Sequence, residues 1–127
     1  MSDATRRTLI LFAHGARDAR WSRTLGDLAS AIRDRDPQRK VATAFLEFQP
    51  PTLEAVLAEA VREGCTHIDV LPVFWASGGH VANDVPPLLE AFRAAHPEIK
   101  LQLLPVLSEL PGLLDFIAQT VVGREPR

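Results

Sequence analysis

The chain has 127 residues, of which 46% are hydrophobic, and this length can bury one core without disulfides. There are 14 Lys and Arg residues against 16 Asp and Glu residues, and the resulting net charge of -2 excludes a global positive field for nucleic acid or anionic membranes. The single cysteine, Cys65, excludes an internal disulfide or a thiolate zinc cluster and is typical of a reducing, cytoplasmic compartment. We expect it to fill space in a strand.

Short apolar runs alternate with longer amphipathic segments, and this alternation predicts an α/β fold with a parallel sheet. The expected strands are 8–13, 40–46, 67–74 and 100–105, and the expected helices are 19–35, 52–63, 85–95 and 110–122. Right-handed crossovers then give a doubly wound, four-stranded parallel sheet in the order 2-1-3-4, flanked by helices. We expect a single domain over 1–127, with an ordered core of about 8–122.

The first apolar run directly follows Arg6 and Arg7, as in a leader peptide, but it is too short and no cleavage site follows it. We therefore interpret it as the first strand. No apolar stretch in the sequence is long enough to span a bilayer, so we expect a soluble protein that does not bind membranes.

Glycine and proline mark the expected helix ends. Gly64 should stop the second helix, because glycine tolerates the left-handed conformation that follows many helices. Asn83 or Asp84 should cap the third helix, with Pro86 and Pro87 in its first turn, where a missing amide donor costs little.

Polar residues follow three of the predicted strands. His14 follows the first, Glu47 the second and His80 the third. The carboxyl ends of parallel strands share one edge, and ligands of doubly wound sheets bind there. Two imidazoles and a carboxylate suit Fe, Co, Ni or Zn with open coordination positions, and imidazole can also accept protons near neutral pH. The pattern predicts a metal site.

Simpler interpretations stand beside this one. A histidine after a strand is often only a hydrogen-bonded loop residue, and Glu47 could instead cap the second helix or pair with an arginine. His67 and His96 are assigned to structure, since one begins a strand and the other ends a helix. Phe74 and Trp75 could line a flat aromatic ligand, but aromatic residues at strand ends more often belong to the core.

Arginines follow the first loop. Arg17, Arg20 and Arg23 could hold carboxylates of a ligand, while a solvated helix face is the ordinary alternative, above all for Arg23.

Three ordered motifs resemble those of the CbiX and SirB sirohydrochlorin chelatases, and the resemblance extends from about residue 8 to residue 121. The motifs are LFAHGARD at 11–18, FLE at 45–47 with PTL at 51–53, and LPVF at 71–74 with GGHV at 78–81 and DVP at 84–86. The resemblance implies that His14 and His80 bind the metal and act as bases, with Glu47 as the matching glutamate. It also implies a chelatase that inserts a divalent metal into sirohydrochlorin, a carboxylate-rich tetrapyrrole, on the way to cobalamin or siroheme.

The resemblance implies further features of the reaction. The metal is substrate, most directly Co²⁺, with Fe²⁺ and Ni²⁺ as alternatives, and no other cofactor is expected. No nucleotide is required, and the sequence has no phosphate-binding loop motif. Substrate contacts are expected at Arg17, Ser77, Gly78 and Gly79. Short members of the family hold one domain, so the chain is expected to form a homodimer.

Two positions depart from the family pattern. Ala16 stands where serine is common, and Gly79 where lysine is frequent, so one hydroxyl and one positive charge near the substrate are missing.

Other functions remain to be weighed. Histidine phosphatases place an arginine directly before their histidine, where this chain has Ala13, and Ser77 lacks the elbow motif of serine hydrolases. A metal or tetrapyrrole carrier would use the same ligands without inserting metal. A degenerate partner in a larger complex would bind no metal at all.

Overall fold

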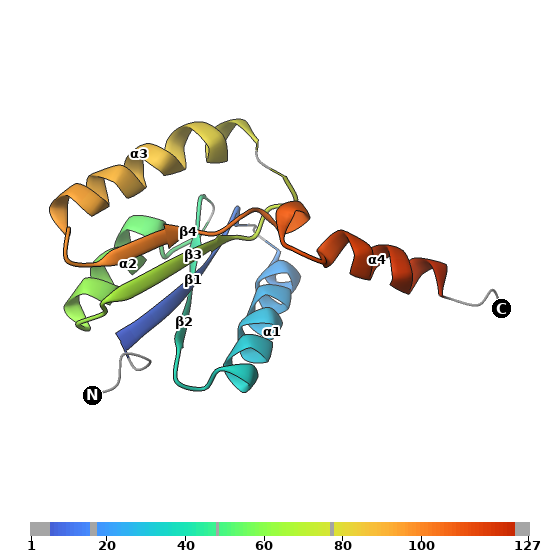
Figure 1. The fold of residues 1–127 in the computed structure, drawn as a ribbon. Coiled ribbons are helices and arrows are strands. Elements are labelled where there is room, and N and C mark those ends of the chain that lie inside the picture. Colours follow the sequence, from blue (N-terminus) through green and yellow to red (C-terminus); the bar gives the residue numbers. More distant parts are fainter. Residues whose placement is uncertain (1–5, 16–17, 48, 77, 124–127) are drawn as a thin grey trace.

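The computed structural model describes residues 6–15, 18–47, 49–76 and 78–123, without the side chains of 79–81. Its centre is a parallel sheet in the order β2-β1-β3-β4, as predicted (Figure 1). The strands are β1 (Arg7–Ala13), β2 (Lys40–Phe45), β3 (His67–Pro72) and β4 (Lys100–Leu103). Strand β1 pairs with both β2 and β3, so its carboxyl end lies at the point where the strand order reverses.

Helices cover both faces of the sheet. The helices are α1 (Ala19–Arg35), α2 (Leu53–Arg62) and α3 (Gly79–Ala95). A short 3-10 helix, η2 (Leu107–Glu109), and the helix α4 (Leu113–Val122) follow β4, and α4 extends away from the sheet (Figure 1). Helix α1 lies on one face, and α2 and α3 lie on the other (Figure 1). This is the doubly wound arrangement expected from the alternation of strands and helices.

The alternation of side chains along β1 divides the core in two. Ile10 and Phe12 pack with α2 and α3, whereas Leu9 and Leu11 pack on the side of α1. Leu11 and Ile10 are completely buried. Burying each such side chain contributes about 1.5–3 kcal/mol, so β1 anchors both layers.

Strand β2 ends at Phe45, one residue earlier than predicted, and two further strands end two residues earlier. Strand β3 ends at Pro72 and not at Phe74, and β4 ends at Leu103 and not at Pro105. Hydrogen bonds continue past both ends, from Val73 N to Phe12 O at 2.7 Å and from Leu104 N to Val70 O at 2.8 Å. The chain therefore stays tied to the sheet after regular pairing stops.

Helix α3 begins at Gly79, with Gly78 as its N-cap, so the predicted cap at Asn83 or Asp84 was wrong. Pro86 and Pro87 lie inside the helix, although each lacks the amide that the helix would use. Val85 and Leu89 on the same helix are buried against the sheet, and this packing offsets the lost hydrogen bonds.

Helix α2 ends as expected, since Gly64 has a φ of 78°. Cys65 is buried in the core, but it lies just before β3. The expectation that it lies within a strand was therefore wrong. In the part of the chain that the structure describes, no helix is long and apolar enough to cross a membrane.

Candidate functional site

The carboxyl ends of β1 and β2 stay hydrogen-bonded to each other beyond the last paired residues. Leu46 N donates to Ala13 O at 2.9 Å, and Glu47 N donates to His14 O at 3.0 Å. These bonds extend the parallel ladder by one step and hold His14 and Glu47 side by side. His14 and Glu47 are 33 positions apart in the sequence, and these bonds make them neighbours at the predicted ligand-binding edge.

Gly15 makes this close approach possible. Its φ is 94°, and a Cβ at this position would overlap the carbonyl oxygen of Glu47, with the carbonyl carbon only 3.2 Å away. Any other residue would be strained by the backbone conformation and would also push β1 and β2 apart.

The side chains of His14 and Glu47 face each other. His14 Nε2 lies 3.4 Å from Glu47 Oε1, and the two side chains are 48% and 46% exposed. His14 Nδ1 lies 3.3 Å from the carbonyl oxygen of Gly15. Half-exposed ion pairs contribute only about 0–1 kcal/mol, so stability alone gives little reason for this pairing.

Aromatic contacts orient the His14 ring. Phe74 meets it edge to face, with centroids 6.5 Å apart and an interplanar angle of 88°. Phe74 in turn contacts Phe12 at 5.8 Å and packs against the core on the side of α2 and α3. The core therefore supports the His14 ring through Phe74. The interpretation of Phe74 as a core residue is confirmed.

A closed loop after β2 carries Glu47. Phe45 N donates to Pro51 O at 2.9 Å, and Gln49 Nε2 donates to Ser22 Oγ of α1 at 3.1 Å. Thr52 caps α2 by accepting a hydrogen bond from Ala55 N. The alternative that Glu47 caps this helix is therefore wrong, and among the described residues its ion pair is with His14 and not with an arginine.

The third motif enters from α3. The backbone of Gly79 and His80 forms the first turn of α3, which begins beyond the carboxyl end of β3 (Figure 1). The side chain of His80 lies outside the described part, as do Arg17 and Ser77 as whole residues. Among the described side chains, no group of three His, Cys, Asp or Glu could hold a metal ion, so His80 as third ligand stays a prediction.

Gly78 leaves open space at the start of α3. Its φ is -114°, which any residue adopts, and nothing lies within 4 Å of a Cβ built at this position. Neither the backbone conformation nor packing against the described residues requires glycine here.

Trp75 lies in the loop beyond β3 and is 57% exposed, so the expectation that it belongs to the core was wrong. Its carbonyl oxygen accepts a hydrogen bond from Ser108 N, and Phe74 O accepts one from Leu107 N at 2.9 Å. Helix η2 thereby fixes the backbone of both aromatic residues while the Trp75 indole faces solvent. The sequence signal that could have identified it is a tryptophan next to the third motif.

The N-terminus of α1 contains a local ion pair. Asp18 caps the helix, and Arg20 Nη2 binds its carboxylate at 2.8 Å. The Arg20 side chain, followed by its backbone amide, holds the pKa of Asp18 below the usual value. Arg20 is thus engaged on the surface, and Arg23 lies exposed on the same helix, as the ordinary interpretation expected.

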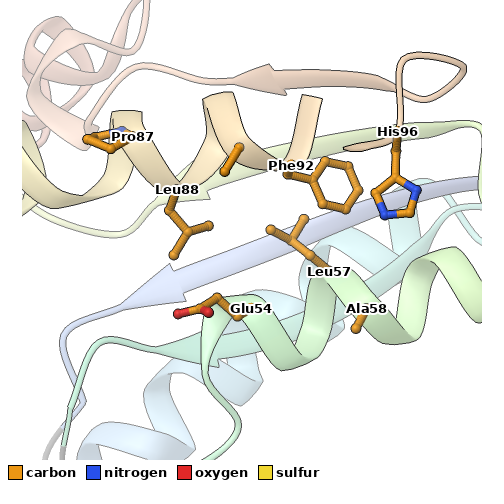
Figure 2. A pocket seen from close by; sticks show the side chains of 8 residues that line it. Glu54, Leu57, Ala58, Pro87, Leu88, Phe92 and His96 are labelled. Carbon is orange, nitrogen blue, oxygen red and sulfur yellow. The ribbon is translucent and has the colours of Figure 1, made fainter. Parts of the chain in front are cut away.

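His67 and His96 lie away from this edge, as expected for structural residues. His67 begins β3, and His96 ends α3 with its ring 4.8 Å from that of Phe92. Figure 2 shows His96 and Phe92 beside a hollow of about 540 Å³ between α2 and α3, with Leu57 on the opposite side. None of the candidate site residues lines this hollow.

The family model for CbiX matches residues 8–123. The sirohydrochlorin cobaltochelatase of Methanocaldococcus jannaschii is 33% identical over 88 residues, which cover 69% of this chain and 62% of that protein. The corresponding protein of Methanococcus aeolicus is 31% identical over 81 residues, covering 64% and 57%. The chain thus spans less than two thirds of the length of these relatives.

Solved structures share the fold. A CbiX protein of Marinobacter aquaeolei VT8, assigned to cobalamin (vitamin B12) biosynthesis, has a TM-score of 0.75 and 31% identity, covering 92% of this chain and 95% of that chain. The sirohydrochlorin chelatase SirB of Bacillus subtilis subspecies spizizenii in complex with cobalt has a TM-score of 0.66 at 23% identity, covering 79% and 43%, which shows similarity of fold alone. With a family match over nearly its whole length, the chain belongs to the CbiX family.

Proposed function

We propose that this protein inserts a divalent metal ion into sirohydrochlorin without ATP, with Co²⁺ as the first candidate and Fe²⁺ or Ni²⁺ as alternatives. The observation that carries the proposal is the facing pair of His14 Nε2 and Glu47 Oε1, 3.4 Å apart. The names of the archaeal relatives, sirohydrochlorin cobaltochelatases, support the same reaction.

The distance between the two donor atoms suits a shared metal ion. Nitrogen and carboxylate ligands lie about 2.1 Å from a small divalent ion, so donors 3.4 Å apart subtend about 108°, close to a tetrahedral angle. The half-exposed side chains leave the other coordination positions to water or substrate. An ion held in this way has exchanged part of its hydration shell before it meets the macrocycle.

Metal insertion releases two protons from the pyrrole nitrogens. We assign their uptake to His14 and to His80, which also serves as the third metal ligand in this proposal. The backbone of His80 lies in the first turn of α3, which supports this assignment because that turn follows the carboxyl end of β3. A ligand to the metal cannot hold a proton at the same nitrogen, so each histidine alternates between the two roles.

We propose that the macrocycle lies over the loop between β3 and α3. Arg17, Ser77, Gly78 and Gly79 are its proposed contacts, and the open space beside Gly78 supports a close approach of the ring to the backbone. The exposed indole of Trp75 offers a flat apolar surface beside this loop. In this proposal residues 1–127 form one domain that acts in the cytoplasm as a homodimer.

The test is cobalt insertion into sirohydrochlorin, followed by absorbance with the purified protein, with His14→Ala and His80→Ala variants and with a reaction without protein. We expect wild type to accelerate insertion and both substitutions to abolish the acceleration. His67→Ala is the matched control, because His67 lies at the opposite end of β3, and it should keep full activity. Binding of cobalt or tetrapyrrole by wild type without faster insertion would contradict a chelatase and identify a carrier.

A further inference from the structure

Helix α4 is amphipathic, and among the described residues no element of the sheet or its covering helices packs over its apolar face. None of its residues is buried, and it extends away from the sheet (Figure 1). Leu114, Ile117 and Val121 follow the spacing i, i+3 and i+7 and are exposed, whereas Asp115 and Gln119 occupy the opposite stripe. Within the described part of the chain, η2 is the element with which α4 has recurrent contacts.

A helix of this kind depends on packing. An isolated helix of ten residues is marginal in water, and most helical stability in proteins comes from burial of the apolar face. The connection to the body is defined: Leu110 packs against the core on the side of α1, and Gly112, with a φ of 84°, turns the chain outward. Helix α4, called the arm below, therefore projects in a defined direction with its apolar face uncovered.

The body of the molecule carries an apolar hollow of about 320 Å³ beside the edge strand β4. Its main lining residues come from the ends of β3 and β4 and from α3: Pro72, Pro86, Leu103, Leu104, Pro105 and Val106. Leu103 is 37% exposed on β4, which is an edge strand of the sheet that the structure describes. Open edge strands and exposed apolar hollows favour association.

The exposed area is also large for one chain. The protein exposes 8318 Å². A compact monomer of 14.0 kDa exposes about 6,700 Å², so the excess is about 1,600 Å². Each partner in a standard stable interface buries about 800 Å², which this excess can supply.

We propose that α4 docks into the β4 hollow of a second copy of this chain, while the partner's α4 docks into the first. This inference deepens the homodimer of the proposed function by naming the element that forms it. Such a reciprocal exchange forms a closed two-fold interface. Charge repulsion does not oppose it, because the apolar stripe of α4 carries no charge and Glu109 is the one charged residue among the described residues that line the hollow.

The exchange also reaches the candidate site. Ala82 and Pro86 line the hollow, and both belong to the helix whose first turn carries His80. At the other end of the arm, η2 is hydrogen-bonded to the backbone of Phe74 and Trp75. The partner's α4 therefore forms a wall against the helix that carries His80, and each site is incomplete in a single chain.

The first experiment measures mass in solution by sedimentation equilibrium, without metal or tetrapyrrole. We expect wild type to have twice the mass of the 14.0 kDa chain. Ile117→Glu places a charge on the apolar stripe of both arms and should weaken dimerisation by at least about 100-fold. Gln119→Glu is the matched control on the polar stripe and should remain a dimer. A monomeric wild type would overturn the proposal.

The second experiment distinguishes exchange from packing of α4 against α4. Leu103→Glu should also give a monomer, because it places a charge in both hollows. A mixture of the Ile117→Glu and Leu103→Glu proteins should form dimers again, since one intact arm then meets one intact hollow. A Leu103→Glu variant that folds, by circular dichroism, and still dimerises would contradict docking into this hollow. Val121→Glu provides a second arm variant if Ile117→Glu does not fold. Because no substrate is present, these outcomes are independent of chelatase activity.

Discussion

His14 Nε2 lies 3.4 Å from Glu47 Oε1 at the carboxyl ends of β1 and β2. The backbone bond from Glu47 N to His14 O sets this relationship, and Phe74 supports the imidazole ring from the core. The pair therefore combines rigid backbone support with two half-exposed side chains. For the proposed metal insertion such support matters, because a pair of side chains that is already placed loses less entropy when an ion binds.

Replacing Glu47 tests the carboxylate as a ligand. Glu47→Gln preserves the shape of the side chain but removes its charge, so we expect Co²⁺ affinity, measured by isothermal titration, to fall by at least about tenfold, or roughly 1.4 kcal/mol. Glu54→Gln on α2 removes a carboxylate outside the pair and should leave the affinity unchanged. Equal affinity in Glu47→Gln and wild type would show that this carboxylate does not bind the ion.

Gly15→Ala tests the close approach of β1 and β2. The new Cβ would overlap the carbonyl oxygen of Glu47 at a φ of 94°, and we expect a loss of about 2–5 kcal/mol in the free energy of unfolding. Gly26→Ala is the control, because Gly26 lies in α1 with nothing within 4 Å of a Cβ. That variant should gain about 0.5–1 kcal/mol. Urea unfolding measures both, and equal stability of the two variants would contradict the clash.

Gly78→Ala separates substrate binding from folding. Its φ of -114° and the empty space around it predict a change in unfolding free energy within about 0.5 kcal/mol. If the tetrapyrrole approaches the backbone here, the added methyl group should raise the KM for sirohydrochlorin and leave metal affinity unchanged. Steady-state insertion kinetics give the KM, and an unaltered value would remove this loop from the substrate site.

Trp75 provides an optical test of the same surface. In a Trp21→Phe background, Trp75 is the remaining tryptophan, and metal-free sirohydrochlorin should quench its fluorescence on binding. The converse variant, Trp75→Phe, keeps Trp21, which packs against the core on the side of α1 and should respond less. Similar quenching of both tryptophans would argue against contact between the ring and Trp75.

Loss of the ion pair of Asp18 with Arg20 should make the protein slightly less stable to unfolding in acid. Arg20 lowers the pKa of Asp18 in the folded protein, so the ion pair stabilises the fold above the unfolded pKa, about 3.8, and this contribution is lost as pH falls through the lowered folded pKa. The pair is exposed, so salt should weaken the effect. Below about pH 4, the Tm of Asp18→Asn should therefore decrease less steeply with falling pH than the Tm of wild type. Equal slopes of Tm against pH for the two proteins would refute this role of Asp18.

Local patterns were sufficient for the architecture. Periods of apolar residues predicted four strands, and the crossover rule predicted their order, because each depends on short-range backbone geometry and chirality. The motifs also predicted that His14 and Glu47 lie together, since a doubly wound sheet brings the residues after its strands to one edge. Gly64 ended α2 as its conformational freedom predicts.

Tertiary packing decided the remainder. Burial of Val85 and Leu89 let α3 start at Gly79 in spite of Pro86 and Pro87, and no local signal states how much packing a helix will gain. The facing of His14 and Glu47 required Gly15 to contact a carbonyl oxygen 32 residues later, at Glu47. The position of α4 likewise depends on long-range contacts: its apolar stripe is visible in the sequence, but only the folded chain leaves that stripe without a partner of its own.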